Sequence, residues 1–397
     1  MFNLPEDFLR ASQTSYHAAD NGAKMLAEAG FVPLDKWDGN AAGVYQVVGG
    51  SLFAAKKGEG GLNLVLSHTD SPALRITGAE GGMLTVEPYG GVLLRSFFDR
   101  QLAIAGREII EENGVLKSKT FTLIEDFVIP SVAVHLGGNE DDLNFSKDAK
   151  VLCSVQGVTR VLTSSPNVRG YDLFCVPAEE HFYAGENGEL LCSPRIDNLA
   201  SVYASLRSLV AANGKSVNAI ACFNNEETGS EGREGAKAPL FLDFLAGACK
   251  AFKAGDAREL LKHAFVFSCD GAHALHPAHP ERYTADAPKL GKGIAVKRND
   301  RYATDAFSFA TAQAIFTRAN QPMQVYCNHP DRRCGSTVGL AFASLTGATV
   351  CDIVVPQLAM HSAVETCAIS DLEALDAILR TYFTLTIKRN GDEITIA

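Results

Sequence analysis

Two adjacent carboxylates, Glu226 and Glu227, follow an apolar run in the segment "VNAIACFNNEETGSE" at residues 217–231. Like charges so close together raise each other's pKa, so the pair is costly unless a cation lies between them or one side chain turns away. The apolar run before them is typical of a buried strand. A cation bound at the end of that strand would offset the repulsion.

Ligand-type side chains follow three more apolar runs in the same manner. These runs and the side chains after them are residues 62–67 with His68 and Asp70, 263–268 with Asp270, and 348–355 with His361. Asp197 lies in the turn before a helix that is predicted from residue 199. Because ligands of open parallel sheets bind outside the carboxyl ends of the strands, we expect all of these side chains at one rim of a sheet.

Histidine, aspartate and glutamate without cysteine form a nitrogen- and oxygen-based metal site, which suits Zn²⁺, Mn²⁺ or Co²⁺. The set exceeds the needs of one tetrahedral ion and suits two ions about 3.5–4 Å apart that share a carboxylate and a water. Asp197 is the candidate bridge. One glutamate of the pair then binds metal, and the other acts as general base toward the metal-bound water.

Each residue taken singly has a simpler interpretation. A histidine after a strand is more often a core or capping residue, Asp70 suits a turn, and Asp197 suits a helix N-cap. Adjacent glutamates are usually a solvated surface feature. The recurrence of ligand chemistry at five equivalent positions favours a dinuclear hydrolase over these separate interpretations.

Helices predicted between the apolar runs place these groups on an α/β framework. They cover residues 7–30, 199–213, 239–255, 305–320 and 370–388. Apolar strands that alternate with helices predict a mainly parallel sheet flanked by helices on both faces. We therefore expect one catalytic domain from residues 1–79 and 179–397. The segment 80–178 is rich in Gly and β-forming residues and predicts an inserted, mostly-β domain.

Composition limits the kinds of binding partner and the cellular compartment that we expect for this protein. The chain has 397 residues and a formal net charge of −10, which argues against nucleic acid or an anionic membrane as the main partner. No apolar stretch approaches the roughly 18 residues that a membrane span requires. The start "MFNLPEDFLRAS" lacks the features of a signal peptide, and the ten cysteines are scattered. We therefore expect a reducing, cytoplasmic location.

Long motifs occur in order along nearly the whole chain: "FLRASQTSYHA", "HTDSPALRI", "SPRIDNLAS", "NNEETGSEG", "SCDGAHALHP", "RYATDA", "CGSTVGL" and "PQLAMHSAVET". With these motifs the sequence resembles the aspartyl aminopeptidase family, dinuclear zinc exopeptidases that form tetrahedral particles. The resemblance implies two Zn²⁺ per subunit, with Mn²⁺ or Co²⁺ as alternatives. The metal ligands that it implies are His68, Asp197, Glu227, Asp270 and His361. It also implies that Asp197 bridges the metals, that Asp70 orients the His68 imidazole, and that Glu226 is the general base.

The resemblance also assigns roles that the residue pattern alone does not suggest. It implies that the β-rich insert is a dimerisation domain, and that His135 in "IPSVAVHLGGNED" reaches the active site of a neighbouring subunit. There His135 would help to stabilise the tetrahedral intermediate. Lys297 in "GIAVKRNDRYATDA" would pair with an acidic N-terminal side chain of the substrate. The competing interpretation of Lys297 is a surface cation run with Arg298 and Arg301.

One segment departs from the family pattern. Before "CGSTVGL" the family carries an Arg-x-Asp element, whereas this chain reads "CNHPDRRCGSTVGL". Asp331 keeps its place, but His329 stands where Arg is expected, and Arg332 and Arg333 make the stretch more basic. The departure weakens the expectation of acidic specificity more than the expectation of peptidase chemistry.

The sequence therefore predicts a homo-oligomeric metallo-aminopeptidase that releases acidic N-terminal residues from peptides, with Glu226 as general base. A related dinuclear amidohydrolase, or an aminopeptidase with neutral specificity, is the alternative within enzymes. An inactive assembly protein is the alternative from another class. Such proteins generally lack the base or a ligand, and here all the expected groups are present.

Overall fold

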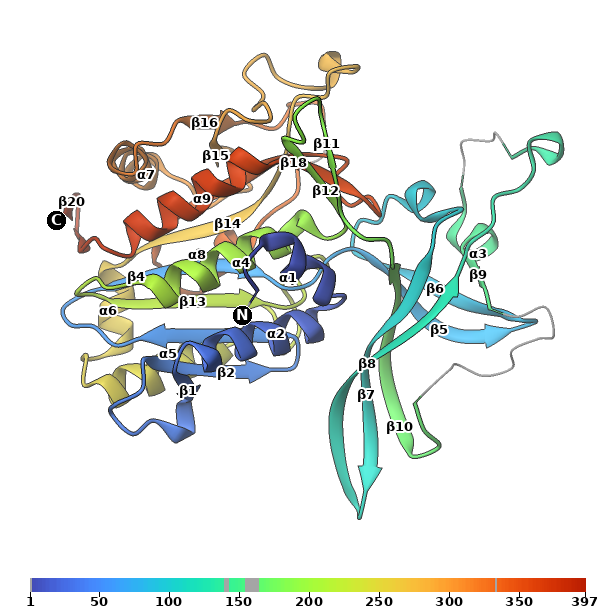
Figure 1. The fold of residues 1–397 in the computed structure, drawn as a ribbon. Helices are drawn as coiled ribbons and strands as arrows, with labels where there is room; N and C mark the ends of the chain where they lie inside the picture. The colour runs from blue at the N-terminus through green and yellow to red at the C-terminus, as the bar shows by residue number, and fades with distance from the viewer. Residues whose placement is uncertain (1, 139–142, 154–163, 333) are drawn as a thin grey trace.

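The computed structural model describes residues 2–138, 143–153, 164–332 and 334–397. Figure 1 shows an α/β body that carries both chain ends, and a second, mostly-β part beside it. This architecture confirms the predicted fold class. No helix among the described residues is both long and apolar enough to cross a membrane.

The centre of the body is a parallel group of strands. In spatial order these are β13 (Val217–Phe223), β4 (Leu62–His68), β14 (Phe265–His273) and β17 (Thr349–Leu358). All four coincide with the predicted apolar runs. The sheet continues with antiparallel and short strands to a total of twelve among the described residues. The outer ones are β1 (Phe31–Pro33), β2 (Gly43–Val48), β3 (Ser51–Lys56), β11 (Phe182–Ala184), β12 (Leu190–Ser193), β15 (Ile294–Lys297), β16 (Met323–Tyr326) and β18 (Glu365–Ala368).

Helices cover both faces of this sheet because its central strands are apolar on both sides. Successive side chains of a strand point to opposite faces, so Val65 joins one buried core and Leu64 joins the other. The core with Val65 packs under α1 (Pro5–Ala11), α2 (Ser15–Glu28), α4 (Ile196–Ala211), α7 (Ala306–Arg318) and α9 (Ile369–Tyr382). The core with Leu64 packs under α5 (Leu240–Phe252), α6 (Ala257–His263) and α8 (Val338–Thr346).

Two predicted helices differ from the observed ones. The helix predicted over 7–30 is broken between α1 and α2, where Thr14 is extended and its hydroxyl lies 2.9 Å from His17 Nδ1. Such local side-chain bonds compete with the helix. The helix predicted over 370–388 ends at Tyr382, and β19 (Ile387–Asn390) then pairs with β20 (Glu393–Ile396). β-branched residues at Ile387 and at Ile394, Thr395 and Ile396 favour this extended pairing.

The second part is an antiparallel sheet with its own core, drawn on the right of Figure 1. Its spatial order is β8 (Val115–Phe127), β7 (Leu102–Glu112), β10 (Val168–Pro177), β5 (Ala73–Glu80), β6 (Met83–Tyr89) and β9 (Lys150–Leu152). The sheet begins at Ala73, before the expected boundary at residue 80, because β5 pairs with β6 and β10.

Side chains of helix α2 contact the β-rich part. Arg107 of β7 lies over the Tyr16 ring, with its guanidinium carbon 4.4 Å from the ring centroid, and its Nε donates to Asp172 at 2.8 Å. Tyr16 donates to the same carboxylate at 3.2 Å. His17 Nε2 lies 3.0 Å from the hydroxyl of Thr122 on β8. These contacts hold the β-rich part against the body next to the strand ends.

Candidate metal centre and active site

Strand register brings three of the predicted residues together. His68 is the last residue of β4, and the parallel pairing of β13 places Phe223 opposite it. Glu227 follows Phe223 by four residues. On the other side of β4, Ser268 pairs with Leu66, which brings Asp270 level with His68. Asp270 lies within β14 and not beyond its end, because this strand continues to pair with β17 as far as His273.

A buried carboxylate, Glu365, holds the two residues that arrive from loops. Its side chain accepts a hydrogen bond of 2.9 Å from the Asp197 N–H and one of 2.7 Å from the His361 N–H. Asp197 lies at the start of α4, where the backbone departs from helical dihedrals. Burial, with the charge of Asp197, raises the pKa of Glu365 to about 8.

Asp197 presents one oxygen to each histidine. Its Oδ1 lies 3.4 Å from His68 Nε2, and its Oδ2 lies 3.8 Å from His361 Nε2. His68 Nε2 is also 3.3 Å from Asp270 Oδ1, and His361 Nε2 is 3.5 Å from Glu227 Oε1. The five predicted metal ligands therefore form two overlapping groups that share Asp197.

Backbone carbonyls orient both imidazole rings. His68 Nδ1 lies 3.0 Å from the Asp70 carbonyl oxygen, and His361 Nδ1 lies 3.0 Å from the carbonyl oxygen of Gly91. A ring that donates from Nδ1 keeps the lone pair of Nε2 free for a metal. In both rings Nε2 is the nitrogen that faces the carboxylates of the other predicted ligands. Gly91 belongs to the loop after β6, so the β-rich part contributes to this centre.

The Asp70 carboxylate anchors the Glu226–Glu227 turn. Its Oδ1 accepts from the Glu226 N–H at 3.2 Å, and its Oδ2 accepts from the Glu227 N–H at 3.1 Å and from Tyr89 at 2.9 Å. The carboxylate is 3.5 Å from His68 Nδ1, farther away than the Asp70 carbonyl. The structure thus adds a second task for Asp70, which is to place the two glutamates.

The five predicted metal ligands and Glu226 line a cavity of about 430 Å³. Burial, together with neighbouring carboxylates, raises the pKa of Glu226 and of Glu227 well above the usual value. Burial lowers the pKa of His68, but the carboxylates of Asp197, Asp270 and Asp70 outweigh it, and the pKa stands well above its usual value. The cavity is therefore short of positive charge.

Lys297 is the only lysine or arginine among the described residues of this cavity. Its Nζ donates to Asp270 Oδ2 at 2.8 Å and lies 5.0 Å from the centroid of the Tyr302 ring. Burial alone would raise the pKa of Asp270, but Lys297 and His68 hold it well below its usual value. Lys297 is buried and forms no surface cation run with Arg298 and Arg301.

His135 lies apart from these residues. It sits in a short 3-10 turn, Val134–Leu136, in the β-rich part, where the chain is exposed. It does not line the cavity of its own chain among the residues that the structure describes.

The sequence interpretation missed three residues of the centre. Glu365 holds Asp197 and His361, Tyr89 holds Asp70, and Gln357 donates to Asp197 Oδ2 at 3.3 Å. Glu365 and Gln357 both occur in the motif "PQLAMHSAVET", but no spacing rule separates them from strand residues. Tyr89 comes from β6, so nothing in its local sequence relates it to the centre.

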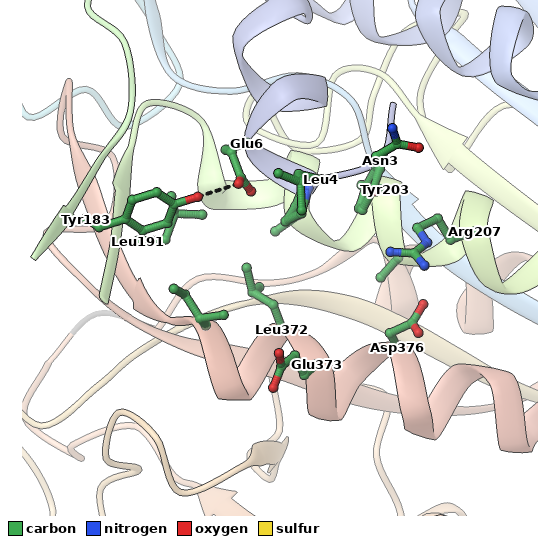
Figure 2. A pocket seen from close by; sticks show the side chains of 14 residues that line it. Asn3, Leu4, Glu6, Tyr183, Leu191, Tyr203, Arg207, Leu372, Glu373 and Asp376 are labelled. Atoms are coloured by element: carbon green, nitrogen blue, oxygen red, sulfur yellow. Dashed lines mark hydrogen bonds between the residues drawn. The ribbon is translucent and has the colours of Figure 1, made fainter. Parts of the chain in front are cut away.

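A second cavity, of about 310 Å³, lies elsewhere on the body (Figure 2). Its walls come from the N-terminal segment, α4, α9 and the strands β11 and β12. Tyr183 donates to Glu6 across it, as the dashed line shows. Glu373 and Asp376 project from α9 and Arg207 from α4. Its described lining contains no histidine or cysteine, so it offers no comparable ligand set.

The residues of the first cavity fit divalent cations. One ligand atom each from His68, Asp197 and Glu227 lies within 4.8 Å of the others. The Oδ1 atom of Asp197 is buried and accepts no hydrogen bond from the described residues. A buried carboxylate oxygen without a donor, beside a histidine and further carboxylates, is the environment that a metal ion completes.

An α/β sheet with histidines and carboxylates gathered at its strand ends, and with a β-rich part beside it, defines a metal-dependent hydrolase. The family model "Aminopeptidase I zinc metalloprotease (M18)" matches residues 8–166 and 150–383. The chain therefore belongs to the M18 family, and it is a zinc metallo-aminopeptidase.

Curated relatives and solved structures agree with this assignment. The chain is 34% identical over 404 residues to "Probable M18 family aminopeptidase 2" of Streptomyces avermitilis, covering 92% of this chain and 93% of the relative. It is 33% identical over 417 residues to the protein of the same name from Azotobacter vinelandii, covering 95% and 96%. The M18 aminopeptidase of Thermotoga maritima has the same fold, with a TM-score of 0.83, 24% identity, and coverage of 95% and 94% of the two chains.

Proposed function

We propose that this aminopeptidase holds two divalent cations and releases acidic N-terminal residues, with Glu226 as general base. The observation that carries the proposal is the position of Asp197, whose two oxygens face different histidines. One cation would be held by His68, Asp270 and Asp197 Oδ1. The other would be held by His361, Glu227 and Asp197 Oδ2. Bound cations of this kind polarise a scissile carbonyl and acidify water.

Glu226 suits the role of general base. It lines the cavity but belongs to neither group of proposed ligands, and Asp70 holds its N–H. A carboxylate placed beside the scissile bond takes a proton from the attacking water and delivers it to the leaving amine. Asp70 acts through this turn as a positioning residue.

Lys297 supports acidic specificity. Its buried ammonium lines the cavity, where a substrate carboxylate would pair with it. Its present bond to Asp270 favours a second candidate, an aminopeptidase with neutral specificity, in which Lys297 serves only to hold Asp270. Comparison of acidic and neutral substrates separates the two.

The β-rich part suits self-association. Val132, Val134 and Leu136 are exposed around His135, and Leu136 keeps 79% of its surface. A similar structure, 22% identical, is described as "Structure of S. cerevesiae mApe1 dodecamer". We propose a homo-oligomer built from dimers, in which His135 approaches the cavity of a partner subunit. All ten cysteines are free thiols, which supports a reducing, cytoplasmic location.

A substrate panel on metal-defined protein tests the function. We expect cleavage of Asp- and Glu-aminoacyl chromogenic amides in preference to the Leu and Lys amides. Activity should disappear after dialysis against a strong chelator and return with Zn²⁺, Mn²⁺ or Co²⁺. Elemental analysis should find two ions per subunit. Activity in metal-free protein would overturn the metal proposal, and a preference for Leu amides would favour neutral specificity.

A further inference from the structure

A basic pocket of about 290 Å³ adjoins the metal cavity. It shares His273, Tyr326 and Asn328 with that cavity, so the two spaces have a common wall. Its own side contains Arg282, His329 and Arg332. Among the described residues it has no carboxylate in its lining, whereas four carboxylates line the metal cavity.

The loop that carries His329 and Arg332 is held in place. Asn328 donates from Nδ2 to the carbonyl oxygens of His329 and Arg332 at 3.0 and 2.9 Å, and Tyr326 donates to Asn328 Oδ1 at 3.2 Å. Thr284 donates to the Cys327 carbonyl at 3.4 Å. The pocket therefore exists before any ligand binds, which lowers the entropy cost of binding.

The two arginines are largely unneutralised. No described residue forms a side-chain hydrogen bond or ion pair with the Arg332 guanidinium, which is exposed. Arg282 lies 3.7 Å from Glu281, whose side chain is 66% exposed. His329 Nδ1 accepts a hydrogen bond of 3.2 Å from the Asp331 N–H, which leaves Nε2 as the nitrogen able to donate. A solvent-exposed pair such as Arg282–Glu281 contributes little and leaves the guanidinium available to an anion.

We infer that this pocket binds a carboxylate of the peptide segment after the scissile bond. The inference rests on the proposed function of the neighbouring site. A peptide that enters with its ammonium group toward the carboxylates of the metal cavity extends its remaining residues out of that cavity. An acidic side chain or the C-terminal carboxylate of this segment then meets Arg332, Arg282 and His329. The two spaces thus match the two ends of an acidic peptide by charge.

Matched peptides test the inference on metal-replete enzyme. All of them begin with the same N-terminal residue, written X, which is the one that the substrate panel shows to be cleaved best. They are X-Glu-Ala-amide against X-Gln-Ala-amide, X-Ala-Glu-amide against X-Ala-Gln-amide, and X-Ala-Ala acid against its amide. We expect at least one carboxylate peptide to have a kcat/KM about tenfold above its neutral match, equivalent to about 1.4 kcal/mol. The pair that shows the difference identifies a side chain or the chain end as the source.

Variants identify the pocket as the cause. Arg332→Gln should remove most of the preference by raising KM at unchanged kcat, and Arg332→Lys should retain part of it. Turnover of an X-chromogenic amide, which has no later carboxylate, should not change. Arg258→Gln, which removes an exposed charge from α6, is the control with the same change in net charge.

The outcomes separate the two proposals. If the wild type cleaves matched peptides equally, the pocket does not bind a substrate carboxylate. The same conclusion follows if Arg332→Gln lowers kcat/KM equally for both members of a pair. Either result leaves the aminopeptidase proposal intact. Absence of N-terminal cleavage in every peptide and amide overturns the proposed function itself. A preference that survives in Arg332→Gln and Arg282→Gln alike also excludes this pocket.

Discussion

The metal cavity and the cavity of Figure 2 differ in how their charged groups are compensated. In the metal cavity, carboxylates from the loop after β13, from β14 and from the start of α4 face one another and share a single lysine. In the cavity of Figure 2, each carboxylate has its own partner or lies in solvent. Glu6 accepts from Tyr183, Asp376 pairs with Arg380 at 2.5 Å, and Glu373 is exposed. Volume alone does not distinguish the cavities, but uncompensated charge does.

The difference follows from the elements that form each wall. Parallel strand ends bring the first residues of several loops to one point, where side chains cannot avoid one another. The sides of helices α4 and α9 instead let long side chains reach water. The contrast shows that crowded like charge, rather than a hollow surface, marks the reactive site of this chain. Matched substitutions in the two cavities test whether crowded like charge marks the reactive site.

The largest effect is expected for Asp197→Asn. The amide keeps the shape but presents only one neutral oxygen, so it cannot serve two cations. Loss of a residue that only hydrogen-bonds to a metal ligand weakens metal binding by about 10–100-fold. Loss of Asp197, which is itself a proposed ligand, should therefore weaken metal binding by more than this factor and abolish turnover. Elemental analysis and an amide assay measure both. Asp376→Asn in the Figure 2 cavity is the control, and comparable losses in both variants would contradict the comparison.

Glu226→Gln and Glu227→Gln should separate two roles within one pair. Glu226→Gln removes the base and should lower kcat by about 10²–10⁴-fold while metal content stays at the wild-type level. Glu227→Gln should lower metal content. Glu373→Gln provides the same change in the other cavity and should alter neither quantity. If Glu226→Gln turns over at the wild-type rate, Glu226 is not the base.

Lys297→Gln should change specificity more than turnover. The amide can still donate to Asp270 but lacks the charge that would pair with an acidic substrate. A hydrogen bond to a charged group contributes about 1.5–3 kcal/mol, so the preference for Asp over Leu amides should fall by roughly ten- to a hundredfold. Loss of metal without a change in preference would instead make Lys297 a positioning residue for Asp270. Arg207→Gln is the control from the Figure 2 cavity.

The smallest effect is expected for Tyr183→Phe. The hydrogen bond to Glu6 and burial raise the pKa of Tyr183 to about 12, but the side chain is half exposed. Losing the bond should lower the free energy of unfolding by about 0.5–1.5 kcal/mol, the usual contribution of one hydrogen bond. Chemical denaturation measures this, and kcat/KM should stay unchanged. A fall in activity would show that the two cavities are coupled.

Local sequence features predicted much of the framework. The four central strands coincide with apolar runs because a sheet covered on both faces requires continuous apolar residues. Helices α4, α5 and α7 coincide with their predicted segments within a few residues. The prediction failed at the α1–α2 break and at the end of α9, where side-chain bonds and the pairing of β19 with β20 override helical periodicity.

By itself, the sequence determined which chemical groups stand at the strand ends and that the pattern requires cations. Tertiary structure decided which oxygen of Asp197 faces which histidine. It placed Glu365 against Asp197, although the two residues are 168 positions apart in the sequence. It also placed Gly91 and Tyr89 beside the centre, and set a basic pocket next to an acidic one. Propensity and periodicity act over a few residues, whereas these contacts depend on strand register and on packing between distant segments.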